Sequence, residues 1–325
     1  MLPSLTVDTV VLAGTGAETS VLLIQRARDP FRHHFALPGG FVDPHEVPIQ
    51  AALRELREET GLTLHESHLV PLTLRGAKGR DPRGWTVSQP YLAVLKDVLP
   101  IYAGDDAASA EWRTLSEIEE LAFDHGSILC DAVGRFWPIF QKSPIQTIRP
   151  WSVPRKLTRM AIYGGTFNPW HAGHSACIEL AATTHNGDLV VVPDRSPFKA
   201  NDDDTCAWKH YRQCQQHAHE LGAWTFPGFL GLEQPNPTCG WFPKLPPRHR
   251  SLVIGADSLA SLPRWWHAAK LIKSIRHLYV VPREADMDAT SNAQLWVHAT
   301  SRRTQLHWLP HHPYEGLSST ALRQA

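Results

Sequence analysis

Apolar residues in the first part of the chain come in short runs that are separated by glycines and polar turns. Between Pro48 and Thr60 they instead recur at helical spacing, and Gly61 suits the end of a helix because glycine readily adopts a left-handed conformation. A Gly39-Gly40 pair before this helix predicts a turn. The pattern predicts strands at 7–13, 21–24 and 91–95, and helices at 48–60, 118–121 and 128–140.

In the second part of the chain, buried apolar runs alternate with glycine turns and a helical stretch. The run at 160–163 leads into Gly164-Gly165, and the helical stretch follows at 175–184. Strand, glycine turn, helix and strand in this order are typical of a parallel α/β sheet. Further strands are predicted at 189–192, 252–254 and 278–281, and the proline-rich stretch 227–247 predicts an extended loop.

A chain of 325 residues is long enough for two domains. Pro144, Pro150 and Pro154 fall where the pattern changes, and few apolar residues lie between them. Prolines in such a stretch are typical of a linker. We therefore predict a first domain at 1–142, a linker at 143–157 and a second domain at 158–325.

Composition narrows the class of protein. Apolar residues make up 42% and charged residues 20%, which suits a packed core and excludes a disordered chain. Lys plus Arg and Asp plus Glu both number 32, and this balance argues against a protein that grips nucleic acid through its phosphates. No apolar run approaches the roughly 20 residues that span a bilayer, and the first residues lack a signal-peptide pattern. The five scattered cysteines favour a reducing cytoplasm over a disulfide framework.

Three carboxylates of the predicted 48–60 helix share one face. Glu55, Glu58 and Glu59 stand at i, i+3 and i+4, and like charges one turn apart repel unless a cation lies between them. Mg²⁺ takes oxygen ligands from carboxylates and from substrate phosphates. Alone, the three residues would also fit a solvated acidic face with an Arg54–Glu58 pair. The complete spacing from Gly40 to Leu62 favours the metal site.

That spacing reads Gly-x5-Glu-x7-Arg-Glu-Leu-x-Glu-Glu-x-Gly-Leu and resembles the Nudix box at each fixed position. The resemblance covers roughly residues 5–142 and implies an α/β/α sandwich that hydrolyses nucleoside diphosphate derivatives with Mg²⁺, or with Mn²⁺ in its place. It implies that Arg54 orients the carboxylates and that Glu46 braces the loop. The implied metal positions are Gly40, Glu55, Glu58 and Glu59.

The resemblance leaves the general base open. Glu55 is implied as a further metal ligand or as the base, and some Nudix members use an acid outside the box. The alternatives in this chain are Asp105, Asp106 and Glu111.

Other segments resemble the ADP-ribose pyrophosphatase branch of that family. One departure is Phe35, where the family usually has Trp before Leu-Pro-Gly-Gly, and the change keeps an aromatic ring. The segments are Leu-Ile-Gln-Arg at 23–26, Arg-Asp-Pro-Arg-Gly at 80–84, Gly-Asp-Asp-Ala at 104–107 and Leu-Ala-Phe-Asp-His at 121–125.

A second motif occupies residues 164–174, between the predicted strand and helix of the second domain. Glycines let the backbone approach a phosphate, and a helix start offers free N–H groups. His171 and His174 are three residues apart and can face the same phosphate. The string Gly-Gly-Thr-Phe-Asn-Pro-Trp-His-Ala-Gly-His resembles the signature of nucleotidylyltransferases, in particular nicotinate or nicotinamide mononucleotide adenylyltransferases. A Rossmann-like domain with a parallel sheet is implied.

Three further segments resemble that family in the same order: Ser-Pro-Phe-Lys at 196–199, Gly-Ala-Asp-Ser-Leu at 255–259 with Trp265 and Trp266, and Leu-Ser-Ser-Thr-Ala-Leu-Arg at 317–323. The resemblance implies that His171 and His174 contact ATP phosphates in catalysis. Because His174 stands at a helix start beside Gly173, we expect it to have little to pack against. The implied substrate-binding residues are Gly164, Gly165, Thr166, Phe167, Asn168, Lys199, Asp257, Trp265, Ser318, Ser319, Thr320 and Arg323.

Two departures concern the second domain. The stretch 235–250 lacks the Tyr-Thr-x-Asp-Thr-Leu helix of bacterial relatives, and the sequence ends two residues after Arg323, where relatives often continue.

The main hypothesis is therefore a bifunctional cytoplasmic enzyme of NAD metabolism. The first domain would hydrolyse ADP-ribose or a related dinucleotide, and the second would transfer an adenylyl group from ATP to nicotinamide mononucleotide (NMN) or nicotinate mononucleotide (NaMN). The rival hypothesis is a regulator whose Nudix domain senses an NAD metabolite. Such regulators carry a DNA-binding winged helix after the Nudix domain, whereas this chain has the nucleotidylyltransferase signature there. We expect no nucleic acid or membrane partner, and a homo-oligomer stays an open alternative.

Overall fold

A computed structural model describes residues 2–104, 107–137, 148–194, 206–234 and 236–324. These residues group into two compact units. The first comprises the described residues of Met1–Val153, Asn201–Arg212 and Leu230–Gln234, and the second those of Pro154–Ala200, Gln213–Phe229 and Pro235–Ala325. Within the described ranges, no helix is long and apolar enough to cross a membrane.

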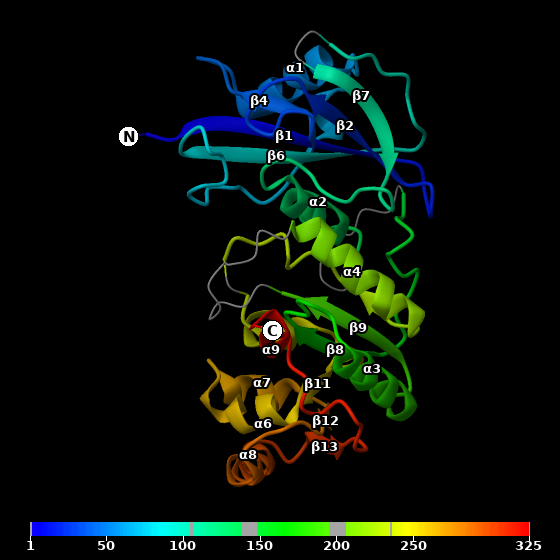
Figure 1. The fold of residues 1–325 in the computed structure, drawn as a ribbon, viewed down its shortest axis with the longest axis vertical. Helices are drawn as coiled ribbons and strands as arrows, with labels where there is room; N and C mark the ends of the chain where they lie inside the picture. The colour runs from blue at the N-terminus through cyan, green and yellow to red at the C-terminus, as the bar shows by residue number, and fades with distance from the viewer. Residues whose placement is uncertain (1, 105–106, 138–147, 195–205, 235, 325) are drawn as a thin grey trace. The chain divides into compact units, whose positions relative to one another are not determined.

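A mixed sheet forms the centre of the first unit, with α1 on one face and α2 on the other (Figure 1). The strand order is β3-β2-β1-β6-β5, while β4 pairs with β1 and β7 pairs with β2. The β1–β6 pair is parallel and the other pairs are antiparallel. The elements are β1 (Ser4–Ala13), β2 (Ser20–Arg26), β3 (Phe35–Ala36), β4 (Gly39–Phe41), α1 (Pro48–Thr60), η1 (Glu66–His68), β5 (Val70–Pro71), β6 (Thr86–Leu95), β7 (Ala107–Thr114) and α2 (His125–Gly134).

The helix α1 has the bounds that the sequence predicts. It begins at Pro48, whose missing N–H costs nothing at a helix start, and it ends at Gly61 with φ of 70°. One side of α1 packs Ala52 and Leu56 against Val7 and Tyr91 of the sheet. Burial of that side fixes the opposite side, with its carboxylates, at the edge of the sheet near β4.

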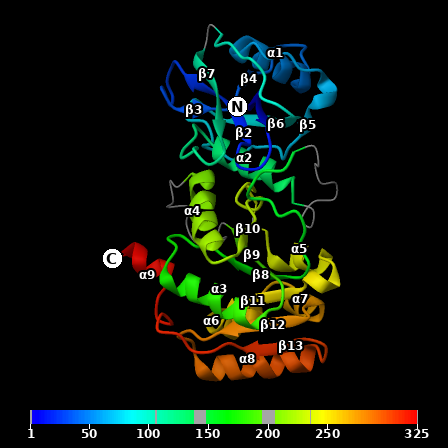
Figure 2. The same cartoon turned by 90° about the vertical axis from the view of Figure 1, so that its right-hand side faces the viewer.

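The second unit contains a sheet of six parallel strands in the order β10-β9-β8-β11-β12-β13. Figure 2 shows β13 at one edge of this sheet, beside α8. The elements are β8 (Met160–Gly165), α3 (Ala172–Thr184), β9 (Asp188–Pro193), α4 (Ala207–Glu220, of which Gln213 onward belongs to this unit), β10 (Trp224–Thr225), α5 (Thr238–Trp241), η2 (Phe242–Lys244), η3 (Pro247–His249), β11 (Ser251–Gly255), α6 (Ala256–Ser261), η4 (Leu262–Arg264), α7 (Ala268–Ser274), β12 (His277–Val281), α8 (Met287–Thr300), β13 (Gln305–Trp308) and α9 (Ser319–Gln324).

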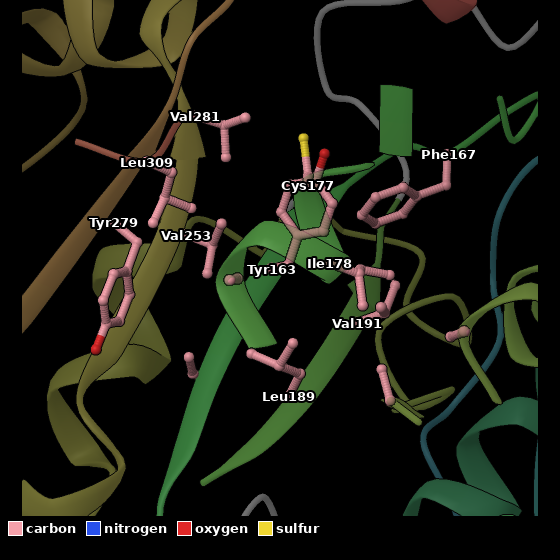
Figure 3. Close-up of a cluster of buried hydrophobic side chains, with 14 of the residues drawn as sticks. Tyr163, Phe167, Cys177, Ile178, Leu189, Val191, Val253, Tyr279, Val281 and Leu309 are labelled. Atoms are coloured by element: carbon pink, nitrogen blue, oxygen red, sulfur yellow. The ribbon is translucent and has the colours of Figure 1, made fainter. Parts of the chain in front are cut away.

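The two faces of this sheet follow the period-2 alternation of its strands. On one face, Tyr163 and Val253 pack against Cys177 and Ile178 of α3 (Figure 3). The neighbouring residues Leu252 and Ile254, together with Val192, point to the other face and line a cavity there. The fold therefore confirms the predicted parallel α/β sheet of the second domain and the predicted α/β/α sandwich of the first.

Three predicted elements differ from the structure. Residues 118–121 form no helix, and the helix predicted at 128–140 begins earlier, at His125, and ends at Gly134. The rest of that predicted helix beyond Trp137 lies outside the described residues. The predicted loop at 227–247 contains α5 and η2, because prolines occupy first helical turns there, as Pro243 does in η2.

Candidate functional site

Arg54 gathers the acidic residues of the first site. Its guanidinium donates two hydrogen bonds to Glu46, at 2.9 and 3.0 Å, and bonds to Glu55 at 2.9 Å and to Glu58 at 3.2 Å. It also donates to the carbonyl of Phe41 at 3.0 Å. The bonds from Arg54 lower the pKa of Glu46. Arg54 thus links Glu46 and the Phe41 carbonyl to the carboxylates of Glu55 and Glu58.

Gly40 lies directly against the carboxylate of Glu55. A Cβ at this position would overlap the Glu55 oxygen atoms, so no other residue fits without moving that side chain. Burial raises the pKa of Glu55, and the negative charges of Glu58 and Glu46 raise it further against the opposing effect of Arg54. The glycine therefore permits close approach of its backbone to the Glu55 carboxylate.

Glu59 points toward the sheet rather than toward Arg54. The backbone N–H of Gly39 donates to its Oε2 atom at 2.9 Å. Burial raises the pKa of Glu59 to about 8, and the charges of Glu55 and Asp8 contribute to the rise. A carboxyl group in this setting is stabilised in its charged form by a nearby cation.

These residues fit a hard divalent cation. The donors are carboxylate oxygens of Glu55, Glu58 and Glu59 and the carbonyl of Gly40, which is the oxygen-rich set that Mg²⁺ and Mn²⁺ prefer. In the described part of the chain no three acidic, histidine or cysteine side chains converge on one point, since Arg54 holds Glu55 and Glu58 while Glu59 turns toward Gly39.

A cavity of about 80 Å³ adjoins Gly39 and Gly40. It brings together residues from three of the separate segments that resemble the pyrophosphatase branch. The guanidinium of Arg26 lies 4.8 Å and that of Arg83 lies 5.5 Å from the ring centre of Phe123. The lining residues from these segments are Ile24, Arg26, Arg80, Asp81, Arg83, Phe123 and His125. Two arginines beside one aromatic ring suit a ligand with phosphates and a flat ring.

Asp8 also lines this cavity, and the sequence analysis missed it. Its carboxylate accepts a hydrogen bond from Ser88 at 2.6 Å and lies 3.2 Å from Nε2 of His125 and 3.4 Å from Arg80. Burial opposes ionisation of Asp8, but the His125, Arg80 and Ser88 contacts outweigh it and lower the pKa to about 2. A charged residue inside the apolar run of β1 was the available signal.

The alternative bases differ in what the structure says of them. Glu111 lies on β7, where it forms an ion pair with Arg113 at 3.2 Å, and it does not line the cavity. Asp105 and Asp106 lie outside the described residues. The identity of the base stays a prediction.

The second site begins at the carboxyl end of β8. His171 and His174 stack with ring centres 3.7 Å apart, and the backbone N–H of His171 donates to Nδ1 of His174 at 3.3 Å. Both side chains are buried, and His174 also contacts the rings of Phe167 and Trp170. The expectation that His174 has little to pack against is therefore wrong, because the loop folds its own aromatic residues around the helix start.

His171 carries two buried ring nitrogens that have no hydrogen-bond partner among the described residues. Burial lowers its pKa, and the positive charge of Arg283 lowers it further. A buried polar group without a partner is costly, so this ring is well suited to meet a polar ligand.

The distant Ser-Ser-Thr segment meets the histidine loop directly. The Ser319 hydroxyl donates to the carbonyl of Pro169 at 3.0 Å, and the Arg323 guanidinium donates to the carbonyl of Asn168. Ser318 caps the start of α9, accepting from the N–H of residue 321 at 3.1 Å. Thr320 belongs to α9, but its side chain lies outside the description, as does the whole of Lys199.

Arg283 is a second residue that the sequence analysis missed. It follows β12 at the carboxyl end of the sheet, donates to the carbonyl of Leu317 at 2.7 Å and lies 3.8 Å from Asp257. A Cβ at Gly255 would overlap the Asp257 carboxylate, so the glycine gives that side chain its space. Arg283 thus ties two of the predicted segments together.

A cavity of about 540 Å³ lies beside these segments, on the α7 side of the sheet. Ligands of open α/β sheets bind outside the carboxyl ends of the strands, and this cavity has that position. Its lining includes the predicted residues Gly164, Gly165, Thr166 and Trp265, together with Trp266 and Trp241. Phe167, Asn168, His171, His174, Asp257, Ser318, Ser319 and Arg323 do not line it.

Comparison with known proteins gives a family for each part of the chain. Residues 3–132 match the NUDIX domain family, and residues 162–325 match the cytidylyltransferase-like family. An ADP-ribose pyrophosphatase of Methanocaldococcus jannaschii is 39% identical over 131 residues, which are 40% of this chain and 72% of that protein.

Two further relatives represent the two hypotheses. A probable nicotinate-nucleotide adenylyltransferase of Methylacidiphilum infernorum is 29% identical over 175 residues, 51% of this chain and 79% of that protein. The ADPR responsive transcriptional repressor NtrR of Acinetobacter baylyi is 34% identical over 137 residues, 41% of this chain, and the chain spans 54% of its length. The chain therefore belongs to the Nudix family in its first part and to the cytidylyltransferase-like family in its second, which confirms both resemblances.

Proposed function

We propose that this member of both families is a bifunctional enzyme of NAD metabolism. Its first unit hydrolyses ADP-ribose or a related nucleoside diphosphate derivative. Its second unit transfers an adenylyl group from ATP to NMN or NaMN. The observation that carries the proposal is the Arg54 network, in which one guanidinium holds Glu46, Glu55 and Glu58 while Gly40 lies against Glu55.

In the hydrolase site, Glu55, Glu58, Glu59 and the Gly40 carbonyl would hold Mg²⁺ or Mn²⁺. When bound, the metal neutralises the diphosphate and lowers the pKa of the attacking water. Arg54 keeps the carboxylates in place, and Arg26 and Arg83 bind the substrate beside Phe123. Water adds to a phosphorus, and the P–O bond of the diphosphate breaks to give AMP and a sugar phosphate.

In the transferase site, a phosphate oxygen of the mononucleotide attacks the α-phosphorus of ATP, and pyrophosphate leaves. No protein nucleophile is needed, so the residues act by positioning and by stabilising charge. The neutral ring of His171 and its neighbour His174 supply polar groups to the phosphates. Ser319 and Arg323 hold the loop backbone in the structure, and we propose that Arg323 and Lys199 also contact the phosphates.

The cavity of about 540 Å³ is the candidate mononucleotide pocket. Trp265 lines it and donates through its indole N–H to Ser261 at 3.0 Å, which fixes the ring. A fixed aromatic ring that lines the same cavity as Gly164 and Gly165 suits a nicotinamide or nicotinate ring next to a phosphate. Asp257, held near Arg283, would contact the ribose.

The rival function is a sensor that binds an NAD metabolite without turnover. The similarity to the NtrR repressor favours it, although that similarity covers only 54% of the repressor. The carboxylates of Glu46, Glu55 and Glu58 around Arg54 favour hydrolysis instead. The five cysteines, all of them among the described residues, form no disulfide, which agrees with our proposal of a cytoplasmic protein.

A single panel of assays tests the proposal. The full chain is incubated with ADP-ribose and Mg²⁺ and the release of AMP is measured, and separately with ATP and NMN or NaMN and the release of pyrophosphate is measured. We expect both products. Tight ADP-ribose binding without AMP release would support the sensor, and turnover of one mononucleotide over the other would define the specificity of the second site.

A further inference from the structure

A second cavity of the second unit, of about 300 Å³, lies at the opposite end of the parallel sheet from the candidate active site. Arg159 precedes β8, Ser251 begins β11 and His277 begins β12, and all three line it. Because the strands are parallel, their amino ends share one edge of the sheet. The two cavities are therefore separate places, and no residue lines both.

The lining of this amino-edge cavity is strongly basic. It contains Arg159, Arg248 and Arg276 and no aspartate or glutamate. None of these guanidinium groups forms an ion pair with a carboxylate of the described residues. Asp188, which begins β9 at the same edge, instead accepts hydrogen bonds from the N–H of Thr158 at 2.9 Å and from its hydroxyl at 3.2 Å. The three arginines thus line one cavity without an ion-pair partner among the described carboxylates, and Nε of Arg248 donates to Nε2 of His249 at 2.8 Å.

Imidazole rings line the same cavity as these arginines. His185 is 7% exposed, its Nδ1 lies 3.2 Å from the Tyr279 hydroxyl, and its Nε2 atom is buried without a hydrogen-bond partner. Figure 3 shows the Tyr279 hydroxyl directed away from Val281, toward the amino end of β12. His185 therefore lines the basic cavity with its ring held by Tyr279, while its Nε2 atom lies buried beside Gly187.

The rings of His277 and His307 also line this cavity. Nδ1 of His277 lies 3.2 Å from Nε2 of His307, and the Tyr279 ring stacks on that of His307 with centres 5.1 Å apart. Histidines alone would also suit a transition metal, but three neighbouring guanidinium groups repel a cation and attract an anion.

We propose that the amino-edge cavity binds a small molecule that carries a phosphate group. Arginine forks match phosphate oxygens in geometry and charge, and the rings of His277 and His307 add polar groups to the same lining. The volume of about 300 Å³ lies at the lower end of small-molecule pockets, so it admits an organic phosphate as well as the free ion. This site serves neither reaction proposed above, and its ligand binds independently of them.

The test is an isothermal titration of the full chain with inorganic phosphate, without added divalent metal. We expect Arg159→Ala and Arg276→Ala each to weaken phosphate binding about tenfold or more, since one charge-assisted hydrogen bond accounts for roughly that factor. Both side chains are exposed, so the variants should fold as the wild type does, and their melting curves without phosphate check this. Arg276→Lys keeps the charge but loses the fork, and we expect it to bind with intermediate affinity.

Lys96→Ala is the matched control, because it removes one positive charge from an exposed position in the first unit. Its affinity for phosphate should equal that of the wild type. The proposal would be overturned if Arg159→Ala and Arg276→Ala bound phosphate with the affinity of the wild type. It would also be overturned if these two variants and Lys96→Ala all lost affinity by the same factor. A parallel titration with AMP separates the two sources of phosphate: tighter Arg276-dependent binding of AMP identifies an organic phosphate, and equal binding identifies the free ion.

Discussion

Glu58 is the most exposed of the three carboxylates on α1, with 51% of its side-chain surface accessible, and it forms an ion pair with Arg54 at 3.2 Å. An exposed pair of this kind contributes little to stability. Glu58→Gln keeps the shape of the side chain and deletes the metal-binding charge. We therefore expect a loss of at least about a hundredfold in AMP release and a change in the free energy of unfolding within about 0.5 kcal/mol.

The matched control for this prediction is Glu66→Gln, which removes an exposed carboxylate from η1. Its rate of AMP release should equal that of the wild type. A full rate for Glu58→Gln at saturating Mg²⁺ would remove Glu58 from the metal site.

The lowered pKa of Asp8 predicts that the stability of the fold depends on pH. Its pKa in the folded chain, about 2, lies below the ordinary value of 3.8. A carboxyl whose pKa is lowered by folding stabilises the fold above its ordinary pKa, and this contribution disappears as the pH falls toward the folded value. Asp8→Asn should therefore lower the free energy of unfolding by about 2 kcal/mol at pH 7, and the difference from the wild type should shrink as the pH falls below about 4.

Urea unfolding of the two proteins at pH 7, 4 and 3 measures this difference, with the exposed variant Asp97→Asn as the control. A difference between wild type and Asp8→Asn that stays constant over this range would mean that Asp8 acts through packing and not through its charge.

The residues that could be predicted from the sequence are those that a local motif fixes. Glu55, Glu58 and Glu59 share a helix face whatever the rest of the chain does. Asp8 and Arg283 could not be predicted in this way, because each takes its role from partners far along the chain, such as His125 and Leu317.

At the scale of elements, β4 and α1 meet at one glycine. A Cβ at Gly40 would overlap the Glu55 carboxylate, so Gly40→Ala should displace Glu55 from Arg54. We expect a loss of about tenfold or more in AMP release with pyrophosphate release from the second site unchanged. Gly76→Ala is the control, since its Cβ would meet only the Val87 side chain at an ordinary 3.7 Å.

Assays of AMP release and of pyrophosphate release on Gly40→Ala test this prediction. An unchanged rate of AMP release would show that Glu55 can leave Gly40 without consequence, and the assigned metal position would then be wrong.

Elements with local signals were predicted with their bounds, and elements without them were not. Pro48 and Gly61 mark both ends of α1 in the sequence itself. β7, by contrast, has the mixed sequence Ala-Ala-Ser-Ala-Glu-Trp-Arg-Thr and becomes a strand by pairing with β2, about ninety residues earlier. The tertiary partner, which no short window of sequence contains, decides such an element.

At the scale of the whole molecule, contiguous motifs were enough to predict two families but not the grouping of every segment. The described residues of Asn201–Arg212 and Leu230–Gln234 belong to the first unit, although they follow the start of the second in sequence. A domain boundary inferred from prolines and motif order cannot detect that later segments belong to the first unit. Their grouping depends on packing and has no signature in the composition.

The two active sites use different residues in different units, so their activities should separate in one variant. His174→Ala removes a ring that stacks on His171 at 3.7 Å and faces the candidate phosphate site. We expect pyrophosphate release to fall about a hundredfold or more, the typical effect of losing one positioned donor, while AMP release from ADP-ribose stays at the wild-type rate. Because His174 is buried against Phe167 and Trp170, the melting temperature should also fall. The exposed variant His298→Ala is the control for both readouts. Loss of both activities with an unchanged melting curve would show that the two sites are coupled, and loss of neither would show that the second unit keeps the signature without the chemistry.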